Sequence, residues 1–187
     1  MRIVVIGEGK VGFTLTRELS REGHDLLVID NRKDALVQVE ERLDVMVLEG
    51  NGASVKVQQA AEVGKCDLMI AVTSADETNL LCCMVARKLG CPHTIARIRN
   101  PEYETQLRFM RGELGLTMSI NPEKAAAHEI ARVLRFPAAM KLESFSKGRL
   151  ELVEYRLPER SALDGVRLLD IYRNARARVL ICAVSRK

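Results

Sequence analysis

The sequence predicts an α/β fold with a doubly wound, mostly parallel sheet of six strands. Short apolar runs alternate with amphipathic stretches through residue 120, as in repeated strand–helix units. The first run, Arg2–Ile6, leads directly into a G-x-G-x-x-G turn, and the second, Leu26–Ile29, ends in Asp30. This arrangement indicates a Rossmann-like domain that binds a dinucleotide or another adenine nucleotide. The alternative is the same fold with an empty glycine turn.

The composition fits a globular chain of one full domain and a smaller piece. Of 187 residues, 47% are hydrophobic, and the net charge of +4 is too small to indicate a nucleic-acid partner. No apolar run approaches the roughly 18 residues of a membrane span, so we expect no direct membrane insertion. The five cysteines form no C-x-x-C pair, which fits free thiols in a reducing cytoplasm. The three histidines are scattered, so no metal site is expected.

Each glycine of the first turn has a predicted task. Gly7 allows a tight exit from the strand, Gly9 lets backbone amides approach a pyrophosphate, and Gly12 lets the helix pack closely on the strand. The helix is predicted from Val11 to Gly23, and its unpaired first amides favour an anion.

The acid at the end of the second strand predicts cofactor selectivity. Asp30 can accept hydrogen bonds from a ribose diol. Two like charges about 4 Å apart repel by about 1 kcal/mol in water and about 4 kcal/mol at an effective dielectric constant of 20. A 2′-phosphate is therefore disfavoured beside Asp30, and we predict NAD(H) over NADP(H), although Arg32 would soften the difference. A helix follows to about Arg42.

A third strand, Val45–Leu48, ends in the run Glu49–Ser54. Two glycines and Asn51 at this end permit close approach of a ligand to the backbone. The alternative is a plain turn into a helix, capped by Asn51 or Ser54.

The fourth strand, Leu68–Val72, brings two hydroxyls to the same edge of the sheet. Thr73 and Ser74 are placed to reach a ribose or a phosphate, and Ser74 or Asp76 can instead cap the next helix. That apolar helix is predicted to end at Gly90.

The fifth strand, Thr94–Arg99, places Arg97 and Arg99 on one face, where an arginine can bind phosphate. The alternative is an ion pair with Asp76 or Glu77.

The remaining chain divides at about residue 136. A helix begins at Pro101, a sixth strand spans Leu116–Ile120, and a helix over residues 122–135 carries an apolar stripe that ends with Ile130 and Leu134. Domain boundaries are therefore expected at 1–136 and 140–187. The second part is a small, partial α+β segment, with predicted strands at residues 150–157 and 179–184, a loop at 161–166 and a short helix at 168–172.

Five runs resemble one known family. They are Met1–Gly12, Glu49–Ser54, Ala71–Asn79, Ile95–Tyr103 and Ile120–Glu123, and they resemble TrkA, the regulatory subunit of Trk-type potassium uptake systems, and related RCK (KTN) domains. The resemblance covers residues 1 to about 136. The tail resembles the first half of the family's C-terminal ligand domain. TrkA is usually a tandem of two such units, and this chain resembles one.

The resemblance implies a nucleotide site along the strand ends. It places phosphates on the glycine turn, the adenosine ribose at the second strand end, the adenosine beside the third, and the rest of a dinucleotide at the fourth and fifth strand ends. An acid at the start of the helix 122–135 would lie near the phosphates or a cation. The candidate residues are Gly7, Glu8, Gly9, Lys10, Val11, Gly12, Asp30, Asn31, Arg32, Asn51, Gly52, Ala53, Thr73, Ser74, Arg97 and Glu123.

Lys10 stands where many relatives have arginine, so the charge is kept and the bidentate fork is lost.

The resemblance also implies a role. The chain would be a cytoplasmic regulatory subunit that binds NAD(H), or ATP or ADP, and gates a membrane potassium channel or transporter through a conformational change. Its helix 122–135 would cross to a partner subunit, and homodimers would assemble into a ring at the inner face of the membrane.

Two other functions compete with this one. An NAD-dependent oxidoreductase with a small C-terminal domain shares the glycine turn and Asp30. No nucleophile with a paired base and no acid suited to hydride transfer stands out, so no catalytic residue and no enzymatic activity are predicted. A redox-sensing repressor is weaker, since the sequence has no helix-turn-helix pattern and no basic recognition helix.

Overall fold

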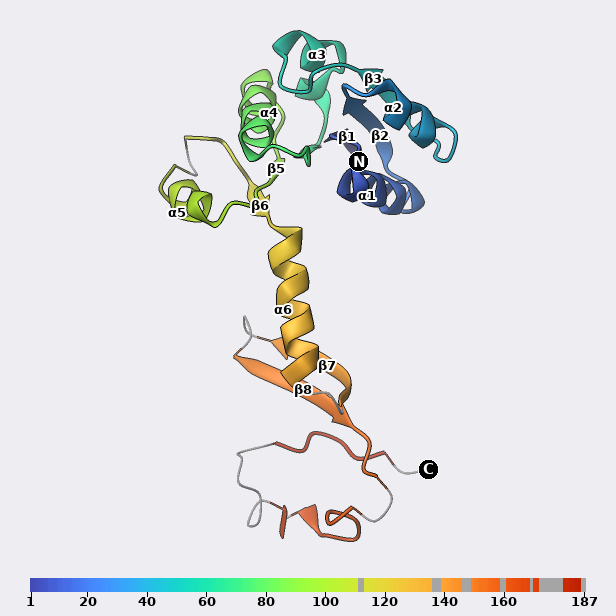
Figure 1. The fold of residues 1–187 in the computed structure, drawn as a ribbon, viewed down its shortest axis with the longest axis vertical. Helices are drawn as coiled ribbons and strands as arrows, with labels where there is room; N and C mark the ends of the chain where they lie inside the picture. Colours follow the sequence, from blue (N-terminus) through green and yellow to red (C-terminus); the bar gives the residue numbers. More distant parts are fainter. Residues whose placement is uncertain are drawn as a thin grey trace. The chain divides into compact units, whose positions relative to one another are not determined.

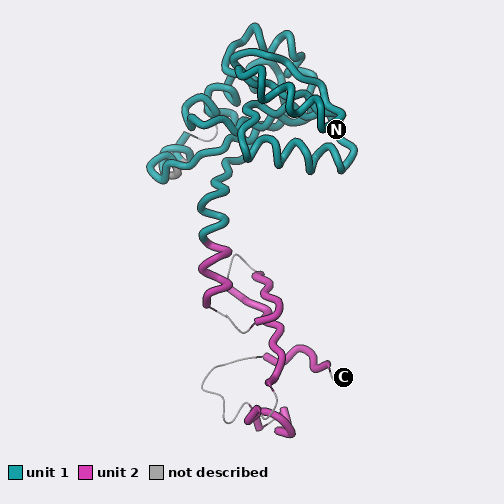
Figure 2. Tube along the Cα trace, turned by 45° about the vertical axis from the view of Figure 1, so that its right-hand side comes forward, with its two compact units in different colours: residues 1–127 teal, residues 128–187 magenta. Residues whose placement is uncertain are grey.

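The fold is that of a computed structural model, which describes residues 1–110, 113–135, 139–145, 149–158, 161–168, 170–171 and 180–185. The chain divides into two compact units, Met1–Ala127 and His128–Lys187 (Figure 2). Within the described residues, no helix combines the length and apolar character needed to cross a membrane.

The first unit is built on a fully parallel sheet of six strands in the order β3-β2-β1-β4-β5-β6 (Figure 1). The order reverses direction between β1 and β4, which is the switch point of a doubly wound fold. The strands are β1 (Arg2–Ile6), β2 (Asp25–Asp30), β3 (Met46–Glu49), β4 (Leu68–Ala71), β5 (Thr94–Arg97) and β6 (Met118–Ile120).

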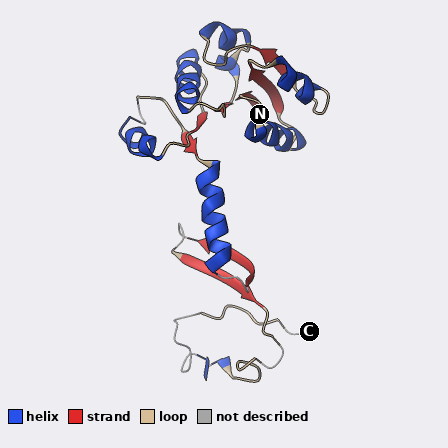
Figure 3. Cartoon of the chain, in the orientation of Figure 1, coloured by secondary structure: helices blue, strands red, loops and turns tan. Residues whose placement is uncertain are grey.

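Helices connect these strands and cover both faces of the sheet (Figure 3). They are α1 (Lys10–Arg21), α2 (Lys33–Glu40), α3 (Val55–Ala60), the short 3-10 helix η1 (Val63–Lys65), α4 (Asp76–Leu89) and α5 (Pro101–Met110). A further helix, α6 (Pro122–Arg135), follows β6 and has no buried residue. The boundary between the two units falls within α6.

The core has two main layers because side chains alternate across the sheet. On one face, Ile3 and Val5 of β1 pack with residues of α1 such as Leu15. On the other face, Val4 and Ile6 pack against residues of α3, η1 and α4. β1, which has neighbours on both sides, is apolar on both faces, and this explains its uninterrupted run of hydrophobic residues.

The predicted fold class is confirmed, and α6 begins and ends where the sequence indicates. The caps predicted for α4 are wrong: its N-cap is Ala75, and no described side chain caps it. Ser54 is the N-cap of α3, again without a side-chain hydrogen bond among the described residues. At the other end of α4, Gly90 adopts φ +111°, as expected for a glycine that stops a helix.

The second unit contains an antiparallel pair, β7 (Ala139–Phe145) and β8 (Leu150–Tyr155). β8 was expected and β7 was not. Residues 180–185 are described without a strand, so the predicted closing strand is wrong over those residues, and Val179 lies outside the described residues. Leu168, Asp170 and Ile171 are helical as predicted, and Tyr172 lies outside the described residues.

Candidate functional site

The carboxyl ends of the six parallel strands meet at one edge of the sheet (Figure 3). The glycine turn follows β1, Asp30 ends β2, the run with Asn51 follows β3, Thr73 follows β4, and Arg97 ends β5. Glu123 lies in the first turn of α6, after β6. The residues predicted from the sequence therefore lie along a single edge, where ligands of open α/β sheets bind.

The glycines of the turn have different surroundings. Gly7 has φ +99°, and a Cβ built on it would lie 2.7 Å from the Thr73 nitrogen. A Cβ on Gly12 would lie 2.0 Å from the Gly7 carbonyl oxygen. No described atom lies within 4 Å of a Cβ built on Gly9. The fold itself therefore requires Gly7 and Gly12, whereas the space beside Gly9 is open.

The start of α1 offers unpaired amides at this open space. Its N-cap is Gly9, and no described side chain caps it. The first bond of the helix runs from the Phe13 amide to the Gly9 carbonyl, at 2.9 Å. The amides before Phe13 lie at the positive end of the helix dipole, so this turn suits an anion. Lys10 is exposed there, whereas Val11 packs toward the sheet.

Asp30 is held by the glycine turn and by its own loop. The Glu8 amide donates to Asp30 Oδ2 at 2.6 Å, and the Arg32 amide donates to Oδ1 at 2.8 Å. Arg32 Nε donates to the same Oδ1 at 3.2 Å, and its guanidinium also reaches the Glu8 carbonyl at 3.0 Å. Asn31 is exposed.

This arrangement keeps Asp30 ionised. Burial alone would raise the pKa of Asp30, but hydrogen bonds from the Glu8 and Arg32 amides and from the Arg32 side chain outweigh burial and lower that pKa. The Arg32 side chain that makes these contacts is 53% exposed.

Glu8 is buried under the same turn, which its position between two glycines did not indicate. Thr16 Oγ1 donates to Glu8 Oε2 at 3.3 Å, and Oε1 has no hydrogen-bond partner among the described residues. Burial is the main cause that raises the pKa of Glu8 to about 7, the nearby Asp30 adds to it, and Thr16 and Arg32 oppose it. Glu8 is thus a buried residue that joins the glycine turn to Thr16 of α1.

We predict that Glu8 makes stability depend on pH. Its pKa is higher in the folded chain than the ordinary 4.5, so protonation favours the folded state. This stabilisation is complete below pH 4.5 and is lost as pH rises through about 7. At 1.36 kcal/mol per pKa unit, it amounts to about 3 kcal/mol. In urea unfolding, Glu8→Gln should therefore gain stability relative to the wild type between pH 5 and pH 8.

The exposed Glu40 at the end of α2 provides a matched control, because Glu40→Gln should leave the pH dependence unchanged. Parallel pH profiles of the wild type and Glu8→Gln would contradict the role of Glu8.

The loop after β3 is shaped by packing. A Cβ on Gly52 would lie 2.1 Å from Ile6 Cγ2, so this glycine lets the loop close onto β1. Gln58 is fully buried and donates to the Gly52 carbonyl at 2.8 Å, which fixes the loop from below. Asn51 is exposed and its Oδ1 accepts from the Ala53 amide at 3.0 Å.

The loop after β4 is organised by Asn79, a residue that the sequence did not single out. Asn79 is fully buried, and its Oδ1 accepts from the Thr73 amide at 2.8 Å and from the Thr73 hydroxyl at 2.7 Å. Its Nδ2 donates to the Arg97 carbonyl at 2.8 Å. The Thr73 hydroxyl is therefore engaged within the protein, and Ser74 is the exposed hydroxyl of this loop. The sequence did contain one indication of this role, because Asn79 is a polar residue on the apolar side of the predicted helix.

The two arginines of β5 and its following loop are both paired. Arg97 forms an ion pair with Glu123, and its side chain is 12% exposed. Arg99 reaches the Ser74 carbonyl and lies 3.6 Å from Asp76 Oδ1. The alternative of an ion pair with Asp76 is thus confirmed for Arg99. Arg97 and Glu123, which are 26 residues apart, meet at the edge of the sheet beside Thr73 and Asn79.

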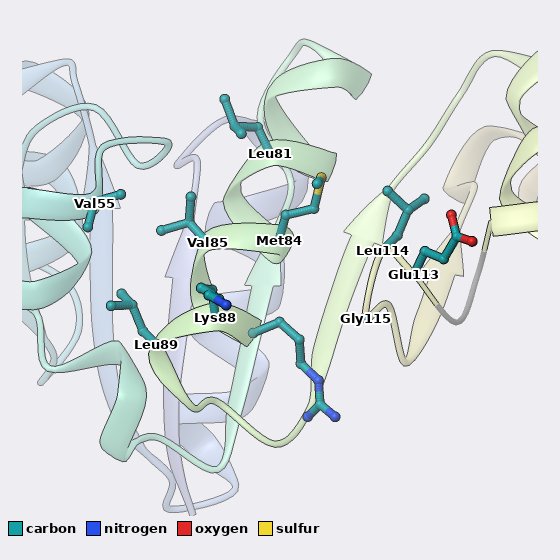
Figure 4. Close-up of a pocket in the computed structure, with 10 residues that line it drawn as sticks. Val55, Leu81, Met84, Val85, Lys88, Leu89, Glu113, Leu114 and Gly115 are labelled. Carbon is teal, nitrogen blue, oxygen red and sulfur yellow. The ribbon is translucent and has the colours of Figure 1, made fainter.

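A groove of about 500 Å³ lies elsewhere, on the outer side of α4 (Figure 4). None of the predicted nucleotide residues lines it. Most of its lining is apolar, with Val55 on one side, Leu81, Met84 and Val85 on α4, and Leu114 on the other side.

The sequence of the first unit matches a known domain family. The sequence model of the TrkA-N domain matches residues 3–122. The chain belongs to the TrkA-N domain family. It is 37% identical to a Trk system potassium uptake protein TrkA homologue of Archaeoglobus fulgidus over 172 residues. This stretch is 92% of this chain and 39% of the relative. A second homologue, from Methanosarcina mazei, is 39% identical over 178 residues, or 91% of this chain and 39% of the relative. The chain thus spans about two fifths of these relatives.

Solved structures share the fold of this TrkA-N chain. The TrkA-N domain of the Escherichia coli inner membrane protein ybaL is 22% identical, with a TM-score of 0.62 over 71% of this chain and 96% of that chain. The GsuK channel bound to NAD is 23% identical, with a TM-score of 0.55 over 64% of this chain and 21% of that chain. The Shewanella denitrificans Kef CTD in its AMP-bound form is 19% identical, with a TM-score of 0.58 over 75% of this chain and 84% of that chain.

Proposed function

We propose that this chain is the nucleotide-sensing part of a non-enzymatic regulatory protein that gates a membrane potassium transporter or channel. The observation that carries the proposal is the open space beside Gly9, bordered by unpaired helix amides and by the ionised Asp30. Membership of the TrkA-N family and the Trk names of its relatives support the potassium role.

In this proposal the nucleotide lies across the switch point of the sheet. Its phosphates bind the turn from Gly7 to Gly12, and its ribose binds Asp30 in place of Arg32. The adenosine borders residues 51–53. The remainder of a dinucleotide extends past Thr73 and Ser74 toward the Arg97–Glu123 pair. NAD(H) occupies the full length, whereas ATP or ADP occupies the half around Asp30.

Binding energy would act on conformation rather than on chemistry. A ligand shifts an equilibrium between two arrangements only by its differential affinity for them, typically about 1–3 kcal/mol of coupling. We place residues 1–136, including helix 122–135, in the nucleotide-binding domain, and residues 140–187 in a partial C-terminal domain. The full protein would act in the cytoplasm, at the inner face of the membrane, through its transporter or channel partner.

The first test is cofactor selectivity. We expect calorimetry to show NADH binding at least tenfold more tightly than NADPH, because Asp30 repels a 2′-phosphate, and tenfold corresponds to about 1.4 kcal/mol. Asp30→Asn should reduce this ratio. The control Asp34→Asn changes an exposed acid in the first turn of α2 and should leave the ratio unchanged. Equal affinities for NADH and NADPH in the wild type would remove Asp30 from this role.

The second test is self-association. Helix α6 has no buried residue, and its Ile130 and Leu134 are 62% and 71% exposed. An apolar stripe of this kind marks a protein interface, so we expect a dimer or larger assembly. Light scattering at micromolar concentration should show Ile130→Asp shifted toward the monomer.

His128 lies about 160° around α6 from Ile130, so His128→Asp should leave the assembly intact. A wild-type monomer under the same conditions would contradict the proposed interface.

A further inference from the structure

Two buried thiols lie in contact at the end of the sheet opposite the glycine turn. The Sγ atoms of Cys66 and Cys91 are 3.3 Å apart, and both residues are buried free cysteines. Cys66 precedes β4 and Cys91 precedes β5, and these two strands are neighbours in the parallel sheet. The pair therefore lies at the amino ends of β4 and β5.

The backbone around each thiol is fixed. A Cβ on Gly64 would lie 2.3 Å from the Leu89 carbonyl oxygen, so η1 packs directly on the last turn of α4. The Cys91 amide donates to the Ala86 carbonyl at 3.0 Å, and the Cys66 amide donates to the Val63 carbonyl at 3.2 Å. Because a disulfide has an S–S length of about 2.05 Å, the two sulfurs need to approach by little more than 1 Å for the bond to form.

We infer that Cys66 and Cys91 form a redox modification site, at which a small peroxide converts the two thiols into an intramolecular disulfide. One thiolate attacks the peroxide, the O–O bond breaks, and a sulfenic acid forms with release of water after proton uptake. The second thiol then attacks that sulfur, the S–S bond forms, the S–O bond breaks, and a second water leaves. The two thiols lose two electrons and the peroxide gains them.

The surroundings select Cys91 as the first nucleophile. Contact with the Cys66 thiol lowers the pKa of Cys91 against the effect of burial, and the Arg87 guanidinium acts in the same direction. In the structure the Cys91 thiol also donates to the His93 carbonyl at 3.1 Å, a bond that is given up when the thiol ionises. Burial raises the pKa of Cys82 to about 12, so that thiol stays protonated. Thiolates are the reactive form, so the pair is favoured over its buried neighbours.

Access requires only a local opening. Each of the two cysteines has an exposed residue on either side in the sequence: Lys65 and Asp67 flank Cys66, and Gly90 and Pro92 flank Cys91. The thiols belong to the main core cluster but lie in connecting segments rather than within a strand, where local opening is least costly.

The test maps disulfides after mild oxidation. The 187-residue chain carrying Cys182→Ser, which removes the exposed thiol, is treated with a small excess of hydrogen peroxide and then alkylated in denaturant. We expect two fewer alkylated thiols and a cross-link between the peptides that contain Cys66 and Cys91. Trypsin leaves Cys66 on the same peptide as Cys82 and Cys83, so cleavage after Glu77 is also needed to assign the bond. Closing this loop should raise the melting temperature by about 5 °C or more.

Single variants separate the pair from its neighbours. Cys66→Ser and Cys91→Ser should each abolish the cross-link and the rise in melting temperature, whereas Cys82→Ser should retain both. Full alkylation of Cys66 and Cys91 after peroxide, oxidation to sulfinic acid without a cross-link, or a disulfide between other cysteines would overturn the inference. If a buried serine at position 66 or 91 impairs folding, the disulfide mapping on the Cys182→Ser chain, in which both cysteines are intact, still shows whether the Cys66–Cys91 bond forms.

Discussion

Gly12→Ala is expected to lower the free energy of unfolding by about 4 kcal/mol. This exceeds the roughly 1–3 kcal/mol typical of overpacking in a core, because the added Cβ meets a backbone atom and not a side chain that could move. A Cβ at Gly12 would lie 2.0 Å from the Gly7 carbonyl oxygen, which cannot move without opening the turn. Helix propensity predicts the opposite sign, since alanine is favoured over glycine inside a helix by up to about 1 kcal/mol. Urea unfolding of wild type and variant decides which effect dominates, and the steric clash is expected to win.

Gly9→Ala is the matched control for stability. Gly9 has φ −80°, which alanine adopts without strain, and no described atom lies within 4 Å of the added carbon. At an N-cap the change should cost less than about 1 kcal/mol. If Gly12→Ala were as stable as Gly9→Ala, the close contact between α1 and the end of β1 would be wrong.

Asn79→Ala is expected to lower the free energy of unfolding by about 4 kcal/mol. The Asn79 side chain is fully buried and satisfies the Thr73 amide and the Arg97 carbonyl, which belong to two neighbouring strand ends. Removing it leaves a donor and an acceptor without partners, at about 1–3 kcal/mol each, and adds a small cavity. Alanine's better helix propensity, about 0.5 kcal/mol, is too small to compensate.

Thermal and urea unfolding measure this loss, and Asn31→Ala is the matched control because Asn31 is exposed. Asn31→Ala should unfold within about 0.5 kcal/mol of the wild type. Equal effects of the two substitutions would show that the Asn79 network does not hold β4 and β5 together.

The sheet was predictable because its signals are local. The central strands β1, β2 and β4 are short apolar runs, and the glycine turn and Asp30 mark the carboxyl ends of β1 and β2. The parallel order then brings all the strand ends to one edge, whatever the details of each loop. α6 was predictable to the residue because Pro122 begins it.

Side-chain partners were not predictable, because they join residues far apart in the sequence. Arg97 could have paired with phosphate, Asp76 or Glu77, and the structure pairs it with Glu123, 26 residues away. Glu8 lies between two glycines, and its burial depends on Thr16 and on the contact of Gly12 with Gly7. β7 becomes a strand through its pairing with β8, which its mixed polar and apolar sequence did not announce.

Nucleotide binding at the glycine turn is tested by calorimetric titration of the wild type and Gly9→Ala with NADH, NAD⁺, ATP, ADP and AMP. The wild type should bind at least one of these ligands at a single site. Gly9→Ala should bind it at least tenfold more weakly while unfolding like the wild type, because the added methyl takes the space of a phosphate. Unchanged affinity in Gly9→Ala, or a wild type that binds none of the five nucleotides, would contradict the account.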